Sequence, residues 1–289
     1  MKIITSVVNN TDFIEIQHRT LQKYFKGSYE FIVFNDAKEF NDVTNGGDLT
    51  IKQKIRETCG KLNIECIDVV NDHHLHMNMS DRHAETFNHY VLPYQIKNPD
   101  KYLLLDSDMF LIDHFDPAQY EKYECAIVLQ SRNTSTYYFW PGLCYIDFTK
   151  IKNQELLNWR CGHECDSGGM MKEWLDKQMG NTPFPTTDDI RWNSKQLHHT
   201  NNIYFIKHLW SCSWNESEVP ETLKNKSNLI RFITDDCRNT NGKFFCEVYD
   251  NVFLHYRAGG NWREEGMELH LNNSSQLKQI LFDACKDCD

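Results

Sequence analysis

The segment KYLLLDSDMFLID, from Lys101 to Asp113, decides the fold that this sequence predicts. The apolar run Leu103 to Leu105 is typical of a buried strand, and Asp106 and Asp108 follow it directly. In an extended segment, residues two apart point to the same side, so both carboxylates should emerge together at the end of this strand. In open α/β sheets, ligands bind at the edge formed by the carboxyl ends of the strands.

The two carboxylates indicate a divalent cation, because neighbouring acids repel each other unless a cation lies between or beside them. Such a cation could hold a diphosphate and neutralise the charge that develops on a leaving group. The alternative is that the acids cap the strand end and face solvent, but unpaired acids between two apolar runs would be costly. Asp287-Cys288-Asp289 repeats the spacing without a preceding strand, which makes it a polar tail.

Around this segment, short β-rich runs alternate with helical patterns, which predicts an α/β fold with crossover connections. Strands are expected at 2–8, 29–34, 64–70, 126–129, 143–148 and 253–256. Helices are expected between the first two strands, after an N-cap at Ser80, and from Gly168 to Met179. Pro93 should end or kink the second of these helices. After about residue 180 the pattern becomes irregular and rich in loops.

Composition narrows the class of protein. With 31 basic and 41 acidic residues, the net charge of -10 argues against a nucleic-acid binder. No apolar run is long enough to cross a bilayer and no signal-peptide core follows Met1, so a cytoplasmic protein is expected. The 11 cysteines show no disulfide spacing. The length fits two domains or one elaborated α/β domain, and the lack of a linker favours one.

Four segments in order resemble the GT-A glycosyltransferases, in particular the glycogenin/galactosyltransferase-like group. They are LLLDSDMFLID, the small-residue strand WPGLCYIDFTK (Trp140 to Lys150), the acidic FPTTDDIRWN (Phe184 to Asn193) and the closing FLHYRAGGNW (Phe253 to Trp262). The resemblance covers residues 1 to about 265. It implies a GT-A type α/β/α sandwich with a Rossmann-like mixed sheet: a nucleotide-binding half (1–113), an acceptor and catalytic half (114–265) and a C-terminal tail or helix (266–289).

The resemblance also implies a metal site. His255 follows an apolar strand and would join Asp106 and Asp108 as a ligand of Mn²⁺ or Mg²⁺. A nitrogen ligand favours Mn²⁺. The alternative is a core histidine satisfied by a backbone group. Arg257 would supply the cation that a lysine provides in relatives, and Gly259 and Gly260 would let backbone N–H groups approach the diphosphate, or simply form a tight turn.

Asp188 and Asp189 are the catalytic candidates that the resemblance implies, with Asp189 preferred; the alternative is a capping or surface pair. One of them would be the base of an inverting enzyme, or lie beneath the anomeric carbon in a retaining one. The sequence leaves both outcomes open. The other residues expected to contact the donor nucleotide are Thr5, Ser6, Val7, Asp36, Arg82, Ser107 and Trp262.

Three other clusters of cysteine and histidine residues give weaker indications of a functional site. Cys161, His163 and Cys165 offer zinc ligand types at an unusual spacing, Cys285 and Cys288 are expected as exposed thiols, and His73, His74 and His76 as a solvated loop.

The function expected is therefore transfer of a sugar from a nucleotide donor, most readily a UDP-sugar, to a hydroxyl of a glycan or other acceptor. The alternatives are a nucleotide-sugar nucleotidyltransferase and a non-catalytic nucleotide- or carbohydrate-binding protein. A cytoplasmic glycan-building enzyme fits best, including one encoded by a microbe or virus.

Overall fold

The computed structural model describes residues 1–289 except 71–77, 133–135, 163, 197–198, 263–265 and 287–289. The predictions for His73, His74, His76, His163 and Asp287 to Asp289 lie outside the described residues. No helix in the described part of the chain is long and apolar enough to span a membrane.

A seven-stranded sheet forms the centre of the fold, in the order β3-β2-β1-β4-β7-β6-β8. Its strands are β1 (Lys2–Val7), β2 (Glu30–Asn35), β3 (Glu65–Asp68), β4 (Lys101–Asp106), β6 (Cys125–Ser131), β7 (Tyr137–Asp147) and β8 (Ile203–Phe205). The first four are parallel to one another, and β7 runs antiparallel to both β4 and β6. This mixed, mostly parallel sheet confirms the predicted α/β class and the Rossmann-like sheet.

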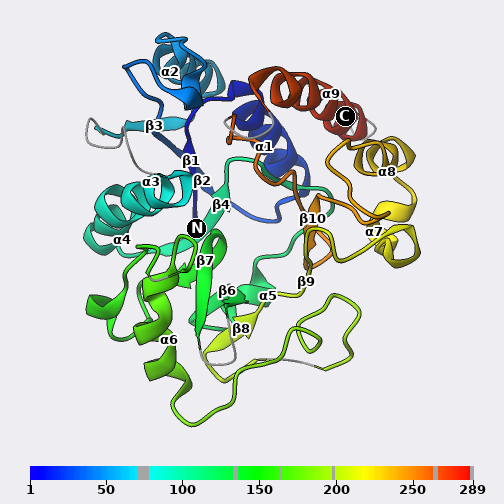
Figure 1. Ribbon diagram of the computed structural model, residues 1–289. Coiled ribbons are helices and arrows are strands. Elements are labelled where there is room, and N and C mark those ends of the chain that lie inside the picture. Colours follow the sequence, from blue (N-terminus) through cyan, green and yellow to red (C-terminus); the bar gives the residue numbers. More distant parts are fainter. Residues whose placement is uncertain (71–77, 133–135, 163, 197–198, 263–265, 287–289) are drawn as a thin grey trace.

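Helices cover both faces of this sheet (Figure 1). The helices of the described residues are α1 (Thr11–Tyr24), α2 (Ile51–Leu62), α3 (Met79–Thr86), α4 (Leu92–Lys97), α5 (Ala118–Glu121), α6 (Lys172–Met179), α7 (Glu221–Lys224), α8 (Ser227–Thr234) and α9 (Met267–Lys286). Of these, α7, α8 and α9 pack in a separate core with α1. Alternation along the strands separates two cores. Ile3 and Leu103 pack with α1 and α2, whereas Ile4 and Leu104 pack on the side of α4 and α6.

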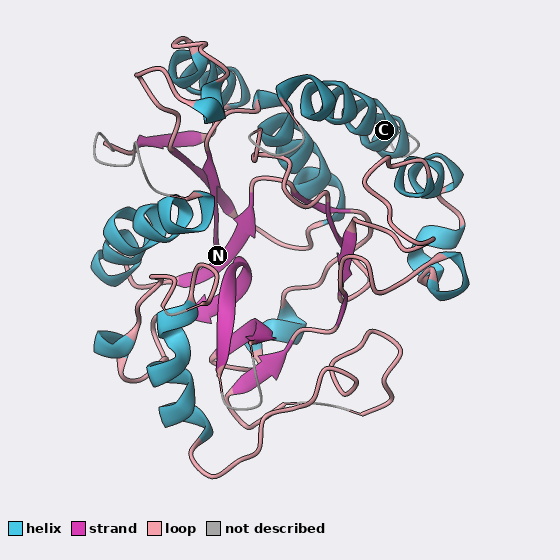
Figure 2. Ribbon diagram, in the orientation of Figure 1, coloured by secondary structure: helices cyan, strands magenta, loops and turns pink. Residues whose placement is uncertain are grey.

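A second, antiparallel sheet has the order β5-β11-β10-β9. Its strands are β5 (Met109–Leu111), β9 (His208–Leu209), β10 (Glu247–Tyr249) and β11 (Phe253–His255). Phe110 of β5 and Leu254 of β11 share a third core with Phe13 of α1 and Leu277 of α9. The long stretch from 180 to 202 has neither helix nor strand among its described residues, as predicted for the loop-rich part (Figure 2).

Several predicted boundaries need correction. The N-cap of α3 is Asn78, whose side chain accepts from the N–H of Asp81, so Ser80 lies within the first turn. The helical path does not end at Pro93: a π-helical turn, Phe87–Val91, precedes α4, and α4 continues to Lys97. β7 begins at Tyr137, ahead of the predicted start at Leu143, because its first residues pair with the end of β6.

Candidate metal site between two cavities

The acid pair lies at a turn between the two sheets. Asp106 is the last residue of β4, at the middle of the large sheet, and Ser107 and Asp108 form a turn before β5 starts in the second sheet. The alternation argument assumed one continuous strand, whereas the pair spans the end of β4 and the turn that follows it. Gln17 of α1 stabilises the turn, because its Nε2 donates to the carbonyls of Asp106 (2.7 Å) and Met109 (3.1 Å).

His255 comes to the same place through strand pairing. In the antiparallel register of β5 and β11, His255 lies opposite Met109, the residue after Asp108. The Nε2 atom of His255 lies 3.1 Å from Oδ1 of Asp108. One ligand atom from each of Asp106, Asp108 and His255 lies within 4.8 Å of the others.

A buried glutamate fixes the imidazole from its other side. The Nδ1 atom of His255 lies 2.8 Å from Oε2 of Glu247, which is its cross-strand partner on β10. The Tyr249 hydroxyl donates to the same oxygen at 2.8 Å, and the N–H of Ser211 donates to Oε1 at 3.0 Å. Orientation by a carboxylate is what a metal-ligating histidine commonly has, and it leaves Nε2 directed at the aspartates.

The electrostatics of the site follow from burial and close charges. Burial and the Asp108 carboxylate raise the pKa of Asp106. Burial alone would raise the pKa of Asp108 as well, but the charge and hydrogen bond of His255, together with the N–H of Gly259, lower it. Burial opposes the charged form of His255, yet Asp108 and Glu247 raise its pKa to about 10. Two carboxylates and one imidazole could hold a divalent ion such as Mn²⁺ or Mg²⁺.

The loop after β11 closes over Asp108. The N–H of Gly259 donates to Oδ2 of Asp108 at 2.6 Å, and a Cβ at Gly259 would lie 2.7 Å from the ring of Phe13. The backbone N–H of Tyr256 donates to the Asp108 carbonyl at 2.9 Å. A side chain at Gly259 would therefore push the loop away from the acid pair.

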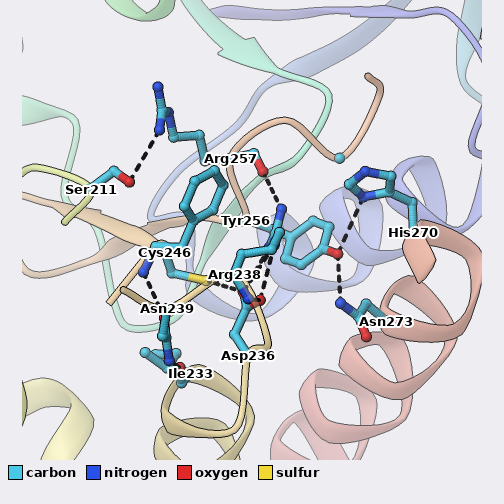
Figure 3. A network of polar contacts seen from close by, with 12 residues as sticks. Ser211, Ile233, Asp236, Arg238, Asn239, Cys246, Tyr256, Arg257, His270 and Asn273 are labelled. Atoms are coloured by element: carbon cyan, nitrogen blue, oxygen red, sulfur yellow. Dashed lines mark hydrogen bonds and ion pairs between the residues drawn. The ribbon is translucent and has the colours of Figure 1, made fainter. Parts of the chain in front are cut away.

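Arg238 supports this loop from below (Figure 3). Its guanidinium forms a buried ion pair with Asp236 and lies 4.2 Å from the centre of the Tyr256 ring. Its Nη1 atom donates to the carbonyl of Arg257 at 2.7 Å. The Arg257 side chain is exposed and reaches the other way, where Nη1 donates to the Ser211 hydroxyl at 3.2 Å.

Two cavities meet at the metal site. The strand-end cavity, of about 420 Å³, is lined by Ser6, Lys38, Arg82, His83, Asp106 and Asp108, among others. The aromatic cavity, of about 650 Å³, is lined by Tyr137, Trp210, Tyr249, Thr186 and Arg132, among others. Trp140, Asp166, His255 and Arg257 line both.

The residues predicted to contact a donor divide into two groups. The strand-end cavity is lined by Ser6, Arg82, Asp106, Ser107, Arg257 and Gly260. Thr5, Val7, Asp36, Gly259 and Trp262 are buried and are not among its lining residues. Asp36 forms a 2.8 Å ion pair with Lys38, and Arg82 forms a bidentate pair with Asp42 at 2.7 and 2.8 Å.

Asp188 and Asp189 are not brought to the metal site. Both lie in a turn where Oδ2 of Asp189 accepts from the N–H of Thr186 at 2.9 Å, and the Asp188 side chain is exposed. The aromatic cavity is lined by their neighbours Thr186, Thr187 and Ile190. The catalytic role of Asp188 and Asp189 stays a prediction.

Sequence reasoning missed Glu247, Asp166, Lys38 and His83 at this site. Glu247 gave a signal, because an acid within the apolar run around β10 has the same unusual context as Asp106. Lys38 lies two residues after the predicted Asp36. No pattern in the sequence marks Asp166 or His83.

Comparisons with known proteins add little about activity. No protein-family model matches the chain, and no curated protein matches it. Among solved structures, the chain is similar to the galactosyltransferase LgtC in complex with donor and acceptor sugar analogs, at 16% identity and a TM-score of 0.34. An active-site mutant of LgtC gives 18% identity and the same TM-score. Each alignment covers 52% of this chain, and spans 59% and 58% of those chains.

Proposed function

We propose that this protein is a metal-dependent glycosyltransferase that transfers a sugar from a nucleotide-sugar donor, a UDP-sugar, to a hydroxyl of a glycan or other acceptor. The observation that supports it most is the position of Asp106, Asp108 and His255 at the junction of two cavities. A group-transfer enzyme needs a binding site for each of two substrates, and the reacting atoms must meet between them.

In this proposal the strand-end cavity takes the donor nucleotide and diphosphate. Asp106, Asp108 and His255 would hold Mn²⁺ or Mg²⁺, which neutralises charge on the diphosphate leaving group when bound. Arg257 lines both cavities, and the planar fork of its guanidinium suits phosphate oxygens. Gly260 lets a ligand come close, because this residue lines the cavity without a side chain.

The aromatic cavity would take the acceptor. Trp140, Trp210 and Tyr137 present ring faces or edges to it, and such rings pack against the apolar faces of sugars. Gln130 and Thr187 add groups that can form hydrogen bonds with sugar hydroxyls. The division into a nucleotide-binding half (1–113) and an acceptor half (114–265), and the cytoplasmic location, remain part of the proposal.

The first test is thermal unfolding with UDP, GDP, ADP or CMP, each with Mn²⁺ or with EDTA. We expect UDP with Mn²⁺ to raise the stability by about 2.7 kcal/mol at a hundredfold excess over Kd, because it binds only the folded chain. Asp108→Asn should lose this shift. The matched control Asp283→Asn, an exposed position on α9, should keep it. No shift with any nucleotide would contradict the proposal.

Product analysis separates the competing functions. With UDP-galactose, UDP-glucose or UDP-N-acetylglucosamine and Mn²⁺, a glycosyltransferase releases UDP, slowly to water and faster with a suitable oligosaccharide. A nucleotidyltransferase, given pyrophosphate, forms UTP and a sugar 1-phosphate instead. Binding of UDP without either product would identify a non-catalytic binding protein.

A further inference from the structure

Asp166 is a carboxylate that borders both cavities. The acids lining the strand-end cavity are Asp106, Asp108 and Asp166, and those lining the aromatic cavity are Asp166 and Glu247. Asp106 and Asp108 belong to the candidate metal site, and the Glu247 carboxylate is hydrogen-bonded to His255. Among the described lining residues, Asp166 is thus the acid common to both cavities and without a part in the metal site.

The backbone around Asp166 is held tightly. Gly168 has φ +89° and its N–H donates to the Trp159 carbonyl at 2.7 Å. A Cβ on Gly168 would lie 2.1 Å from the carbonyl oxygen of Phe139 in β7, and one on Gly169 would lie 1.9 Å from the carbonyl oxygen of Cys161. The turn is therefore pressed against β7 at the residue before Trp140, and only glycines fit there.

A hydrogen bond connects this turn with the donor side of the site. The hydroxyl of Ser167, which is buried, lies 3.1 Å from Nδ1 of His83 on α3. Both Ser167 and His83 line the strand-end cavity. The half-buried Asp166 side chain uses Oδ1 to accept from the N–H of Ser167 at 2.7 Å, which orients the carboxylate. The geometry is that of a preorganised carboxylate rather than of a mobile surface acid.

We propose that Asp166 is the catalytic base of the transfer, an inference that rests on the proposed function. Its carboxylate takes the proton of the acceptor hydroxyl as the acceptor oxygen forms a bond to the anomeric carbon of the sugar. The bond between that carbon and the diphosphate oxygen breaks, and the nucleoside diphosphate leaves with the electron pair. The junction of an acceptor cavity and a donor cavity is where such a base must lie.

The inference competes directly with the assignment to Asp188 or Asp189. Those carboxylates lie in a turn from which Thr186, Thr187 and Ile190 line the aromatic cavity, and neither carboxylate is among the lining residues of the strand-end cavity. A base must reach the acceptor hydroxyl at the point where it meets the donor sugar. Asp166 borders both cavities and therefore meets this requirement.

The test uses the full chain with Mn²⁺ and UDP-galactose, UDP-glucose or UDP-N-acetylglucosamine, with water or an oligosaccharide as the acceptor, and measures UDP release. Asp166→Asn keeps an oxygen that can accept from Ser167, so the turn should persist and the melting temperature should change little. We expect UDP release to fall by at least about 100-fold, the usual contribution of a general base. The UDP-induced thermal shift should remain, because Asp166 is not a metal ligand. Asp176→Asn, at an exposed position on α6, is the matched control.

Azide distinguishes a base from a merely structural residue. Azide is already an anion, so it needs no base when it displaces the diphosphate and forms a glycosyl azide. We expect azide to restore UDP release in Asp166→Ala, with the glycosyl azide detected by mass spectrometry. Full UDP release by Asp166→Asn would overturn the inference. Failure of azide to restore UDP release in Asp166→Ala, together with its restoration by azide in Asp189→Asn, would overturn it as well. No UDP release by the unsubstituted chain would overturn the proposed function itself, and this inference with it.

Discussion

The carboxylate of Glu247 holds Nδ1 of His255 at 2.8 Å, on the side of the imidazole opposite to Asp108. The two residues face each other across the β10–β11 pair, so the register of the second sheet sets the orientation of the ring. This places a hydrogen-bonded carboxylate behind the candidate metal ligand, as in many metal sites.

Glu247→Gln should weaken Mn²⁺ binding by about 10- to 100-fold, the usual cost of losing such a partner. Mn²⁺ affinity measured by electron paramagnetic resonance would check this without relying on turnover. Glu268→Gln, exposed on α9, is the control. Equal Mn²⁺ affinity in Glu247→Gln and the unsubstituted chain would show that Glu247 does not orient His255.

Two buried groups near the second sheet should give the stability opposite dependences on pH. Burial lowers the pKa of His208 to about 4, below its unfolded value, so the unfolded chain takes up the proton first and stability falls as the pH drops from about 6.5 to 4. Burial raises the pKa of Asp250 to about 6, despite hydrogen bonds from Tyr120 and Lys207, so stability falls as the pH rises from about 4 to 6.

In the overlap, between about pH 4 and 6, these two contributions should largely cancel. His208→Gln should expose the dependence of Asp250, and Asp250→Asn that of His208, each with a slope of up to about 1.4 kcal/mol per pH unit. Urea unfolding at several pH values measures both slopes. The same pH profile in both variants would contradict the prediction.

Gly168→Ala should destabilise the protein by about 1–3 kcal/mol, because the residue has a positive φ and the added Cβ would collide with a backbone carbonyl. The same urea titration can compare it with Gly60→Ala, where nothing lies within 4 Å of the new Cβ. Gly60 lies inside α2, so its replacement should stabilise the protein by up to about 1 kcal/mol. A harmless Gly168→Ala would mean that the turn at Gly168 can move away from Phe139.

Arg238→Lys should separate nucleotide binding from metal binding. A lysine cannot both pair with the Asp236 carboxylate and donate to the Arg257 carbonyl, as the fork of Arg238 does (Figure 3). The loop carrying Arg257 should loosen, and we expect UDP affinity to fall about tenfold, or 1.4 kcal/mol, with Mn²⁺ affinity nearly unchanged. Calorimetric titrations check both. Arg231→Lys on the exposed side of α8 serves as the comparison, and equal UDP affinities would refute the coupling.

The sequence predicted the parts of the site that depend on local pattern. Asp106 and Asp108 stood out because acids interrupt an apolar run, and His255 because it ends another. Glu247 is placed by a cross-strand pairing, and Asp166 by a turn whose Gly168 contacts Phe139 of β7, 29 positions earlier in the chain. Neither contact produces a periodic pattern in the sequence, because each depends on which segments meet in three dimensions.

The same reasoning explains the errors in the predicted elements. Asn78 and Ser80 are both good N-cap residues, and the choice between them depended on where the extended chain enters α3. The alternation argument for the acid pair assumed one strand, whereas the chain changes sheets at Ser107 and Asp108. The strand-end location was nevertheless predicted, because β4 ends at Asp106 in either case.

The pairing of Met109 with His255 joins the beginning of the second sheet to a strand that is synthesised almost 150 residues later. A chain emerging from the ribosome can form the first strands and their helices before this partner exists. The set of three candidate ligands is complete only when β11 has paired with β5. Tight binding of a divalent ion by this protein would therefore indicate that β11 has folded onto β5. Truncation of the chain before β11 should abolish this binding.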